Sequence, residues 1–282
     1  MTDRIAFQGL PGAYSDMACR ARYPDWQTLP CPSFEDAFQA VTAGEARLAM
    51  IPIDNSSAGR VADVHHLMPE SGLHIVAEHF QRVRHQLLAP VGATLQSIRE
   101  VHSHVQALSQ CRNYLRRNGF KAVIAADTAG AAAEVALRGD PAAAALASQL
   151  AGEIYGLATV AADVQDAGEN TTRFVIMAKD PIHPEPDVGP VITSFVFRVR
   201  SVPAALYKAL GGFATNGVNI TKLESYIIDH GFTVAQFYAD IDGHPDDRLV
   251  RLALEELSFF SREVKILGVY PADPYRQGVN GS

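Results

Sequence analysis

A polar cluster stands directly before an apolar segment near residue 170. Asn170, Thr171, Thr172 and Arg173 precede the run 174–177, whose apolar residues predict a buried strand. Ligands of α/β domains bind at strand ends, so a hydroxyl and a guanidinium at this place could hold an anionic ligand. An Asn-Thr turn with a surface arginine would give the same pattern. The cluster therefore needs support from other segments.

Three other segments share this design. Each is a polar turn between a short apolar strand and a helical pattern, and they comprise residues 9–15, 52–59 and 103–111. Backbone N–H groups, amides and hydroxyls gather at such turns. Four of them in one domain predict one shared binding site.

These four segments, together with residues 127–132 and 147–157, resemble the prephenate dehydratases in their usual order along the chain. Residues 191–270 resemble the ACT domain that follows the catalytic domain in that family. The resemblance covers nearly the whole chain. It implies an enzyme that converts prephenate to phenylpyruvate, water and carbon dioxide on the phenylalanine pathway.

The order of elements predicts an α/β fold. Strand-like runs alternate with helical patterns, which favours a mostly parallel sheet. A crossover after residue 80 and a return after residue 157 would make the domain bilobal, and the resemblance implies a fold like that of the two-lobed periplasmic binding proteins. The predicted strands are 5–7, 48–53, 75–80, 83–88, 122–125 and 174–177, and the helical patterns include 34–43 and 111–117.

A proline-rich segment marks the expected domain boundary. Residues 179–190 contain four prolines, which exclude regular structure. We expect a catalytic domain over residues 1–180 and an ACT regulatory domain over residues 190–272. Beyond the boundary the patterns predict a strand, a helix, two strands around a turn at 229–231, a helix and a strand. This is the ferredoxin-like βαββαβ order.

The implied reaction releases a ring hydroxyl as water and a carboxylate as carbon dioxide, and formation of the aromatic ring drives both. Thr172 matches the threonine of the family's Thr-Arg-Phe motif, and we expect its hydroxyl to assist departure of the leaving oxygen. Arg173 is expected to bind a substrate carboxylate bidentately, with Phe174 as a further substrate contact. The alternatives are a turn that uses the Thr172 hydroxyl and a salt bridge from Arg173 to Asp166 or Glu169.

Amides and a carboxylate complete the predicted catalytic set. Asn55 and Ser56 match the family's Asn-Ser pair, and Gln106 matches the glutamine of its Ser-His-x-Gln segment. Amides orient a leaving hydroxyl without adding a charge that would repel the substrate. Asp54 stands where the family more often has glutamate. Because one methylene less moves a carboxylate by about 1.5 Å, Asp54 is predicted either as an acid or as a positioning group.

Three hydroxyl side chains are predicted either to cap a helix or to contact the ligand. Ser15, Ser103 and Thr128 each stand near a predicted helix start. We predict them as substrate contacts, with helix capping as the equal alternative. His104 is assigned to structure. The remaining histidines, among them His85, form no convincing set of metal ligands and are interpreted as surface residues.

Residues 219–225 resemble the phenylalanine-binding segment of the family's ACT domain. The predicted effector contacts are Asn219, Leu223, Glu224, Ser225, Ala204 and Leu206. L-Phenylalanine bound between two such domains would inhibit by shifting an equilibrium between open and closed forms, and the pairing implies a homodimer or homotetramer. Two positions depart from the family: Ala204 replaces a glycine, which narrows the room for a ligand, and Tyr226 replaces an arginine.

Composition excludes several classes of protein. The chain has 282 residues, a net charge of −7 and three cysteines without metal or disulfide spacing. We therefore expect no nucleic-acid partner, no metal or other cofactor and a reducing, cytoplasmic setting. We also expect neither a secretory signal nor a membrane span, because no basic segment with an apolar core and no long apolar run is present in the sequence. Gly9 and Gly12 are no dinucleotide fingerprint, because the third glycine and the acidic residue are missing.

Two alternatives remain open at this point. An arogenate dehydratase would perform the same ring chemistry on a substrate whose side-chain ketone is replaced by an amine. A non-catalytic amino-acid sensor would keep the bilobal fold and the ACT domain, although it has little physical need for Asn55, Gln106, Thr172 and Arg173 together. The chain has no helical region of the length of a fused chorismate mutase, so we expect a monofunctional enzyme.

Overall fold

A computed structural model describes residues 3–185, 189–200, 202–228 and 235–279. The chain divides into two compact units, one of residues 1–61 and 79–174 and one of residues 62–78 and 175–282. The expected limits of 1–180 and 190–272 stay a prediction, and they differ from this division because residues 62–78 belong with the second unit. The turn expected at 229–231 lies outside the described residues. None of the described helices is long and apolar enough to cross a membrane.

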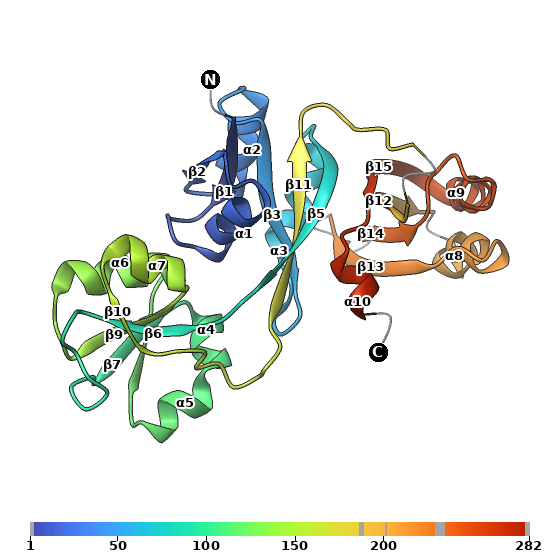
Figure 1. The fold of residues 1–282 in the computed structure, drawn as a ribbon. Coiled ribbons are helices and arrows are strands. Elements are labelled where there is room, and N and C mark those ends of the chain that lie inside the picture. The colour runs from blue at the N-terminus through green and yellow to red at the C-terminus, as the bar shows by residue number, and fades with distance from the viewer. Residues whose placement is uncertain (1–2, 186–188, 201, 229–234, 280–282) are drawn as a thin grey trace. The chain divides into compact units, whose positions relative to one another are not determined.

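The first lobe of the first unit is built around a sheet that contains three neighbouring parallel strands. Its strand order is β2-β1-β3-β11-β5, and the short β4 pairs with β3. Strand β1 runs parallel to both β2 and β3, and α1 and α2 pack against these strands (Figure 1). The elements are β1 (Arg4–Gln8), α1 (Tyr14–Arg22), β2 (Gln27–Cys31), α2 (Phe34–Thr42), β3 (Leu48–Asn55), β4 (Gly59–Arg60), β5 (His74–Arg82) and β11 (Thr171–Ala178).

The second lobe has a sheet of order β10-β6-β9-β7-β8. Its central strand β9 is a run of buried residues, and successive side chains of a strand point to opposite faces. Ala143, Ala145 and Ala147 pack with α6 and α7, whereas Ala144 and Leu146 pack with α4 and α5. The elements are β6 (Gln86–Ala89), β7 (Glu100–Ser103), α4 (Val105–Gln110), α5 (Arg112–Arg117), β8 (Lys121–Ile124), α6 (Thr128–Arg138), β9 (Ala143–Ala147), α7 (Gln149–Tyr155) and β10 (Ala158–Ala161).

Two segments of chain connect the lobes. The chain leaves the first lobe through residues 83–85 and returns through residues 162–170, as Figure 1 shows. The two segments are hydrogen-bonded to each other, from Val83 N to Asn170 O (2.7 Å) and from Val164 N to His85 O (2.9 Å). The predicted bilobal α/β fold, of the periplasmic-binding-protein type, is therefore confirmed.

The expectation of mostly parallel strands is wrong for the second lobe. Strand β7 runs parallel to β8 and β9, but β6 runs antiparallel to both β9 and β10. The reason lies in the connections, because β6 enters the lobe while β10 leads out of it. A pattern of alternating strands and helices does not record that reversal.

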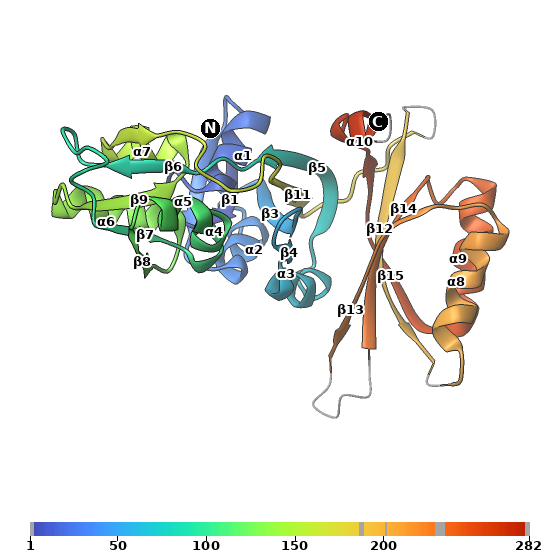
Figure 2. The ribbon, with the colours of Figure 1, turned by 90° about the horizontal axis from the view of Figure 1, so that it is seen from below.

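The second unit contains a sheet of four antiparallel strands in the order β13-β14-β12-β15. Phenylalanines on one face of the sheet pack with α8 and α9, and Figure 2 shows both helices on that face. The predicted βαββαβ order is confirmed. The elements are β12 (Val191–Val199), α8 (Ala205–Thr215), β13 (Ile220–Ile227), β14 (Ala235–Asp242), α9 (Arg248–Phe260) and β15 (Ser261–Pro271), followed by α10 (Tyr275–Val279).

The other face of this sheet is covered by α3 (Ala62–Leu67), the 3₁₀ turn η1 (Met68–Glu70) and the start of β5. The ring of His65 lies 5.1 Å from that of Tyr238, and Lys265 Nζ donates to Pro69 O. Gly268 allows this approach, since a Cβ there would lie 2.1 Å from Ile75 O. Residues 62–78 thus form an integral part of the second unit.

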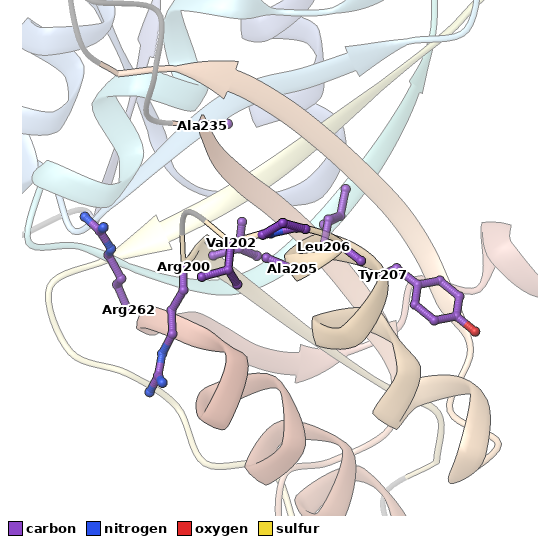
Figure 3. A pocket seen from close by; sticks show the side chains of 10 residues that line it. Arg200, Val202, Ala205, Leu206, Tyr207, Ala235 and Arg262 are labelled. Atoms are coloured by element: carbon purple, nitrogen blue, oxygen red, sulfur yellow. The ribbon is translucent and has the colours of Figure 1, made fainter.

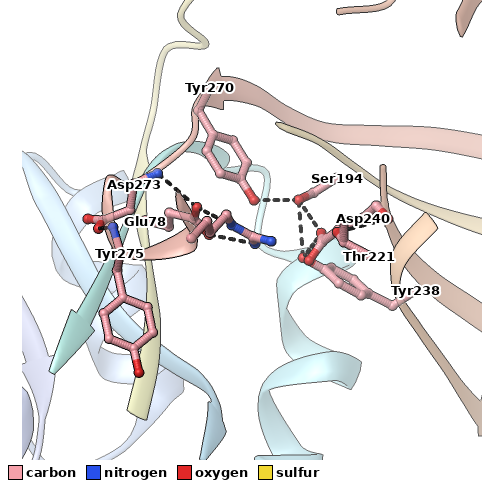
Figure 4. A network of polar contacts seen from close by, with 9 residues as sticks. Glu78, Ser194, Thr221, Tyr238, Asp240, Tyr270, Asp273 and Tyr275 are labelled. Carbon is pink, nitrogen blue, oxygen red and sulfur yellow. Dashed lines mark hydrogen bonds and ion pairs between the residues drawn. The ribbon is translucent and has the colours of Figure 1, made fainter. Parts of the chain in front are cut away.

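A polar network is buried beneath this cover (Figure 4). The Asp240 carboxylate, which is fully buried, accepts hydrogen bonds from the hydroxyls of Ser194 and Tyr238. Tyr270 OH lies 2.7 Å from Ser194 Oγ. A buried carboxylate requires such partners, because its charge has lost the solvation of bulk water.

Candidate active site

The ends of β3 and β11 place Asn55 beside Thr172. Ser56 N donates to Thr171 O (2.9 Å) and Thr171 N donates to Ser56 Oγ (3.0 Å), so the two chain segments are fixed in register. Asn55 Nδ2 then lies 2.9 Å from Thr172 Oγ1. The structure therefore brings together three of the predicted site residues, Asn55, Ser56 and Thr172.

The turn after β3 fixes which way the Asn55 amide faces. Its oxygen accepts from the backbone N–H groups of Ser57 (3.0 Å) and Ala58 (2.9 Å), so its NH₂ group must point to Thr172. The threonine oxygen consequently acts as an acceptor in this bond. Its own hydrogen remains able to donate to another group.

A chain of amides continues from Asn55 toward the second lobe. Asn55 Nδ2 also donates to Asn170 Oδ1 (2.7 Å), and Asn170 Nδ2 donates to Gln110 Oε1 (2.9 Å). Gln110 is the last residue of α4. The chain therefore joins the polar turns of both lobes through uncharged side chains.

Sequence analysis assigned Gln106 to this role and missed Gln110. Gln106 is exposed, and among the described residues its side chain makes no hydrogen bond to the amide chain. Both glutamines lie on α4, where positions four apart share a face. The signal that favours Gln110 is its place at the helix end, next to the buried Cys111.

Burial raises the pKa of the Cys111 thiol to about 12, so the thiol is un-ionised and does not act as a nucleophile.

His85 and Tyr14 extend the same network. His85 Nε2 lies 2.7 Å from Gln110 Oε1, and His85 Nδ1 lies 2.8 Å from Tyr14 OH. The interpretation of His85 as a surface residue is wrong, because only 2% of it is exposed. Burial lowers its pKa, a shift that the hydrogen bond to Gln110 opposes. Burial likewise raises the pKa of Tyr14 well above its ordinary value.

The turn after β1 docks on the second lobe. Ser148 Oγ donates to Gly12 O (2.5 Å) and Tyr155 OH donates to Pro11 O (2.9 Å). Gly12 has a φ of +87°, and a Cβ there would lie 2.7 Å from the Cα of Ala151. Its glycine is therefore needed for close contact between the lobes. Ser15, the second residue of α1, is buried.

Two further predicted substrate contacts, Ser103 and Thr128, lie at the end of β7 and at the start of α6. Ser103 is fully buried and donates to Leu146 O (2.6 Å). Capping by Ser103 or Thr128 is not observed, since the caps of α4 and α6 are His104 and Asp127.

Three further predicted residues belong to β3 and β11. Asp54 lies opposite Arg60 in the β3–β4 pair. Arg173 and Phe174 are 7% and 1% exposed, and strand alternation puts Arg173 on the opposite face of β11 from Thr172. The described residues contain no group of acidic, histidine or cysteine side chains that could hold a metal ion.

Three of the six predicted effector residues lie near the two ends of α8. Ala204 and Leu206 line a cavity of 540 Å³ at the start of the helix, where Figure 3 shows Arg200 and Arg262 on the side away from Tyr207. Asn219 follows the other end and donates to Asp242 Oδ2 (2.7 Å). Three further residues lie on β13: Glu224 pairs with Lys222 (3.2 Å), and Leu223 and Ser225 are exposed.

Three comparisons relate this chain to known proteins. The family model for prephenate dehydratase matches residues 5–182. A bifunctional N-acyl-homoserine lactone acylase/prephenate dehydratase from Komagataeibacter europaeus is 50% identical over 97% of this chain and 97% of its own length. A chloroplastic arogenate dehydratase/prephenate dehydratase from Arabidopsis thaliana is 39% identical over 96% of this chain and 73% of its own length. The crystal structure of prephenate dehydratase from Arthrobacter aurescens in complex with L-Phe has a TM-score of 0.86 at 29% identity and covers 95% of this chain and 89% of that one.

Proposed function

We propose that this chain, which belongs to the prephenate dehydratase family, catalyses the decarboxylating dehydration of prephenate to phenylpyruvate in phenylalanine biosynthesis. The observation that carries the proposal is the bond from Asn55 Nδ2 to Thr172 Oγ1. In this bond the threonine oxygen is the acceptor, so the hydrogen of the threonine hydroxyl is available to donate to a ligand. Such a fixed donor is what a departing hydroxyl requires.

The arrangement suits a reaction in which negative charge develops on a leaving oxygen. The ring C–O bond breaks with its electron pair going to oxygen, and the C–C bond to the carboxylate supplies a pair to the ring. The Thr172 hydroxyl donates a hydrogen bond to the leaving oxygen, while Asn55, Asn170 and Gln110 hold it in place without adding charge. Donors fixed before the reaction need no reorganisation when the charge appears.

The other substrate contacts are proposed from the family motifs. Arg173 binds a spectator carboxylate, and Ser56, Ser15, Ser103, Thr128 and Phe174 form the rest of the site. Asp54 remains a candidate for the acid or for a positioning group. Gln110 is a better candidate than Gln106 for the amide that reaches the substrate, because Gln106 is exposed and Gln110 belongs to the amide chain.

Feedback inhibition by L-phenylalanine through the second unit is part of the proposal. Ala204 and Asn219 flank α8, whose eleven residues make a helix of roughly 16 Å. One amino acid is too short to touch both ends in one chain. Two copies are therefore required, which supports a homodimer or a homotetramer built from dimers. The exposed edge of β13, which among the described strands pairs only with β14, offers a strand for that association.

Ala204 provides a test of backbone strain at the start of α8. Its φ of +61° lies in the left-handed region, which strains any residue with a Cβ. We expect Ala204→Gly to stabilise the protein by about 0.5–1 kcal/mol in urea unfolding, because relief of strain exceeds the entropy gained by the unfolded chain. Ala205→Gly, one residue into α8, is the matched control and should destabilise by roughly 0.5–1 kcal/mol. Equal effects of both changes on the free energy of unfolding would contradict the prediction that the backbone at Ala204 is strained.

Two relatives suggest further activities to assay. The Arabidopsis protein is named for both arogenate and prephenate, and the two substrates differ only outside the reacting ring. The Komagataeibacter protein is also named as an N-acyl-homoserine lactone acylase. Hydrolysis of the amide bond of an N-acyl-homoserine lactone is therefore the second candidate activity.

We place the enzyme in the cytoplasm because its three cysteines are free and buried.

The deciding experiment measures phenylpyruvate formation from prephenate by the purified chain without added metal or nucleotide. We expect turnover that L-phenylalanine suppresses. Arogenate and an N-acyl-homoserine lactone are assayed in parallel. Activity on arogenate alone would replace the proposed substrate, and binding of phenylalanine without turnover of any of the three would favour the sensor.

A further inference from the structure

His85 occupies the space between a tyrosine and the amide chain of the candidate active site. It lies in the segment that joins the lobes, where its backbone N–H donates to Gln165 Oε1 (3.0 Å). Its ring has one nitrogen at Gln110 and the other at Tyr14, with the rings of His85 and Tyr14 edge to face at 5.5 Å. Both ring nitrogens are therefore engaged inside the protein.

The contacts determine where the imidazole carries its proton. Gln110 Oε1 is an amide oxygen and can only accept, so His85 Nε2 must carry a hydrogen. Burial favours the uncharged ring, and in that form Nδ1 is an acceptor. The Tyr14 hydroxyl donates to Arg84 O (2.9 Å) and lies 2.8 Å from Nδ1, so its single hydrogen is shared between these two acceptors and no hydrogen is needed on Nδ1.

Two donors hold the Gln110 amide in one orientation. Gln110 Oε1 accepts from both His85 Nε2 (2.7 Å) and Asn170 Nδ2 (2.9 Å), so both of its lone pairs are used. The NH₂ group must then face the opposite way. Among the described residues it has no hydrogen-bond partner, and Gln110 is only partly buried.

We propose that His85, held by Tyr14, is a positioning residue that turns the Gln110 amide so that its NH₂ group faces the substrate. This inference rests on the proposed dehydratase function for its kinetic consequences, but the orientation itself does not depend on any substrate. His85 touches no reacting atom. It acts by excluding the flipped amide, in which the Gln110 nitrogen would face the Nε2 hydrogen.

A matched pair of variants separates the two contacts of His85. The amide nitrogen of glutamine can take the place of Nε2 as a donor, and the amide oxygen of asparagine can take the place of Nδ1 as an acceptor. His85→Gln keeps the donor to Gln110, whereas His85→Asn keeps only the contact with Tyr14. We expect His85→Gln to retain kcat within about threefold and His85→Asn to lower it at least tenfold, with similar thermal midpoints for both.

A double-substitution cycle tests whether the effect passes through Gln110. In a Gln110→Ala background, His85→Asn should change kcat less than twofold, because the group that it positions is gone. An effect of His85→Asn as large in that background as in the wild type would overturn the inference. So would equal losses in the two His85 variants.

An NMR measurement separates this inference from the proposed function. The side-chain NH₂ signals of Gln110, identified by their loss in Gln110→Ala, should be single in the wild type and in His85→Gln and shifted or doubled in His85→Asn. Unchanged signals in His85→Asn would overturn the positioning role. The expected signals in a protein that does not turn over prephenate would keep the positioning role and overturn only the proposed substrate.

Discussion

Replacing Thr172 by valine should lower kcat for prephenate by about 100- to 1,000-fold, the effect of removing one preorganised donor from a charge-developing transition state. Valine keeps the branched shape of the side chain, so the packing of β11 is preserved and only the hydroxyl is lost. KM should change little if the hydroxyl bonds mainly to the departing oxygen in the transition state. Steady-state phenylpyruvate formation measures both constants.

Thr172→Ser is the matched control for this prediction. Serine keeps the hydroxyl that Asn55 Nδ2 binds at 2.9 Å, and we expect it to retain most of the turnover. The loss of the hydroxyl in Thr172→Val leaves Asn55 bonded to Asn170 and to the turn at Ser57 and Ala58, so the fold should persist. Near-normal kcat in a folded Thr172→Val would remove the hydroxyl from the chemistry.

The sequence allowed the meeting of Asn55 and Thr172 to be predicted because both stand at strand ends. Asn55 ends β3 and Thr172 lies at the start of its neighbour β11, and a polar segment beside an apolar run marks each of these strand ends. The amide chain beyond them was not predictable in this way. Asn170 and Gln110 are 60 residues apart, and their contact depends on how the return segment passes α4.

His85 shows a second limit of the pattern. The segment around it carries polar and charged residues and gives no apolar periodicity, which is typical of an exposed loop. The structure buries it because two connecting segments run together and enclose its ring. Burial that arises from the meeting of distant segments has no local signature.

The second unit illustrates both outcomes. Its βαββαβ order followed from alternation in the strands and from the apolar face of each helix. The attachment of residues 62–78 to its sheet did not follow from the sequence pattern, because that contact depends on Gly268, almost 200 residues further along the chain. A domain limit drawn at the prolines therefore omits the segment that covers one face of the sheet.

An ion pair holds the C-terminal helix to that segment (Figure 4). Glu78, on β5, has no exposed side-chain surface. Its carboxylate accepts two hydrogen bonds from Arg276, at 2.6 Å from Nε and 2.8 Å from the terminal nitrogen. Asp273 N adds a third at 3.0 Å.

Replacing Arg276 by methionine should lower the free energy of unfolding by about 3–5 kcal/mol, because it leaves a buried carboxylate without its cation. Methionine keeps much of the arginine's apolar length, so the effect reports the charge more than lost packing. Urea unfolding at pH 7 measures it.

The control is the double variant Glu78→Met/Arg276→Met. With both charges gone, no unpaired ion is buried, and stability should recover to within about 2 kcal/mol of the wild type or exceed it. A double variant as unstable as the single one would mean that packing of the helix, and not the charge, causes the loss. If Arg276→Met costs less than about 1 kcal/mol, the pair behaves like an exposed salt bridge, and Glu78 must then reach water in solution.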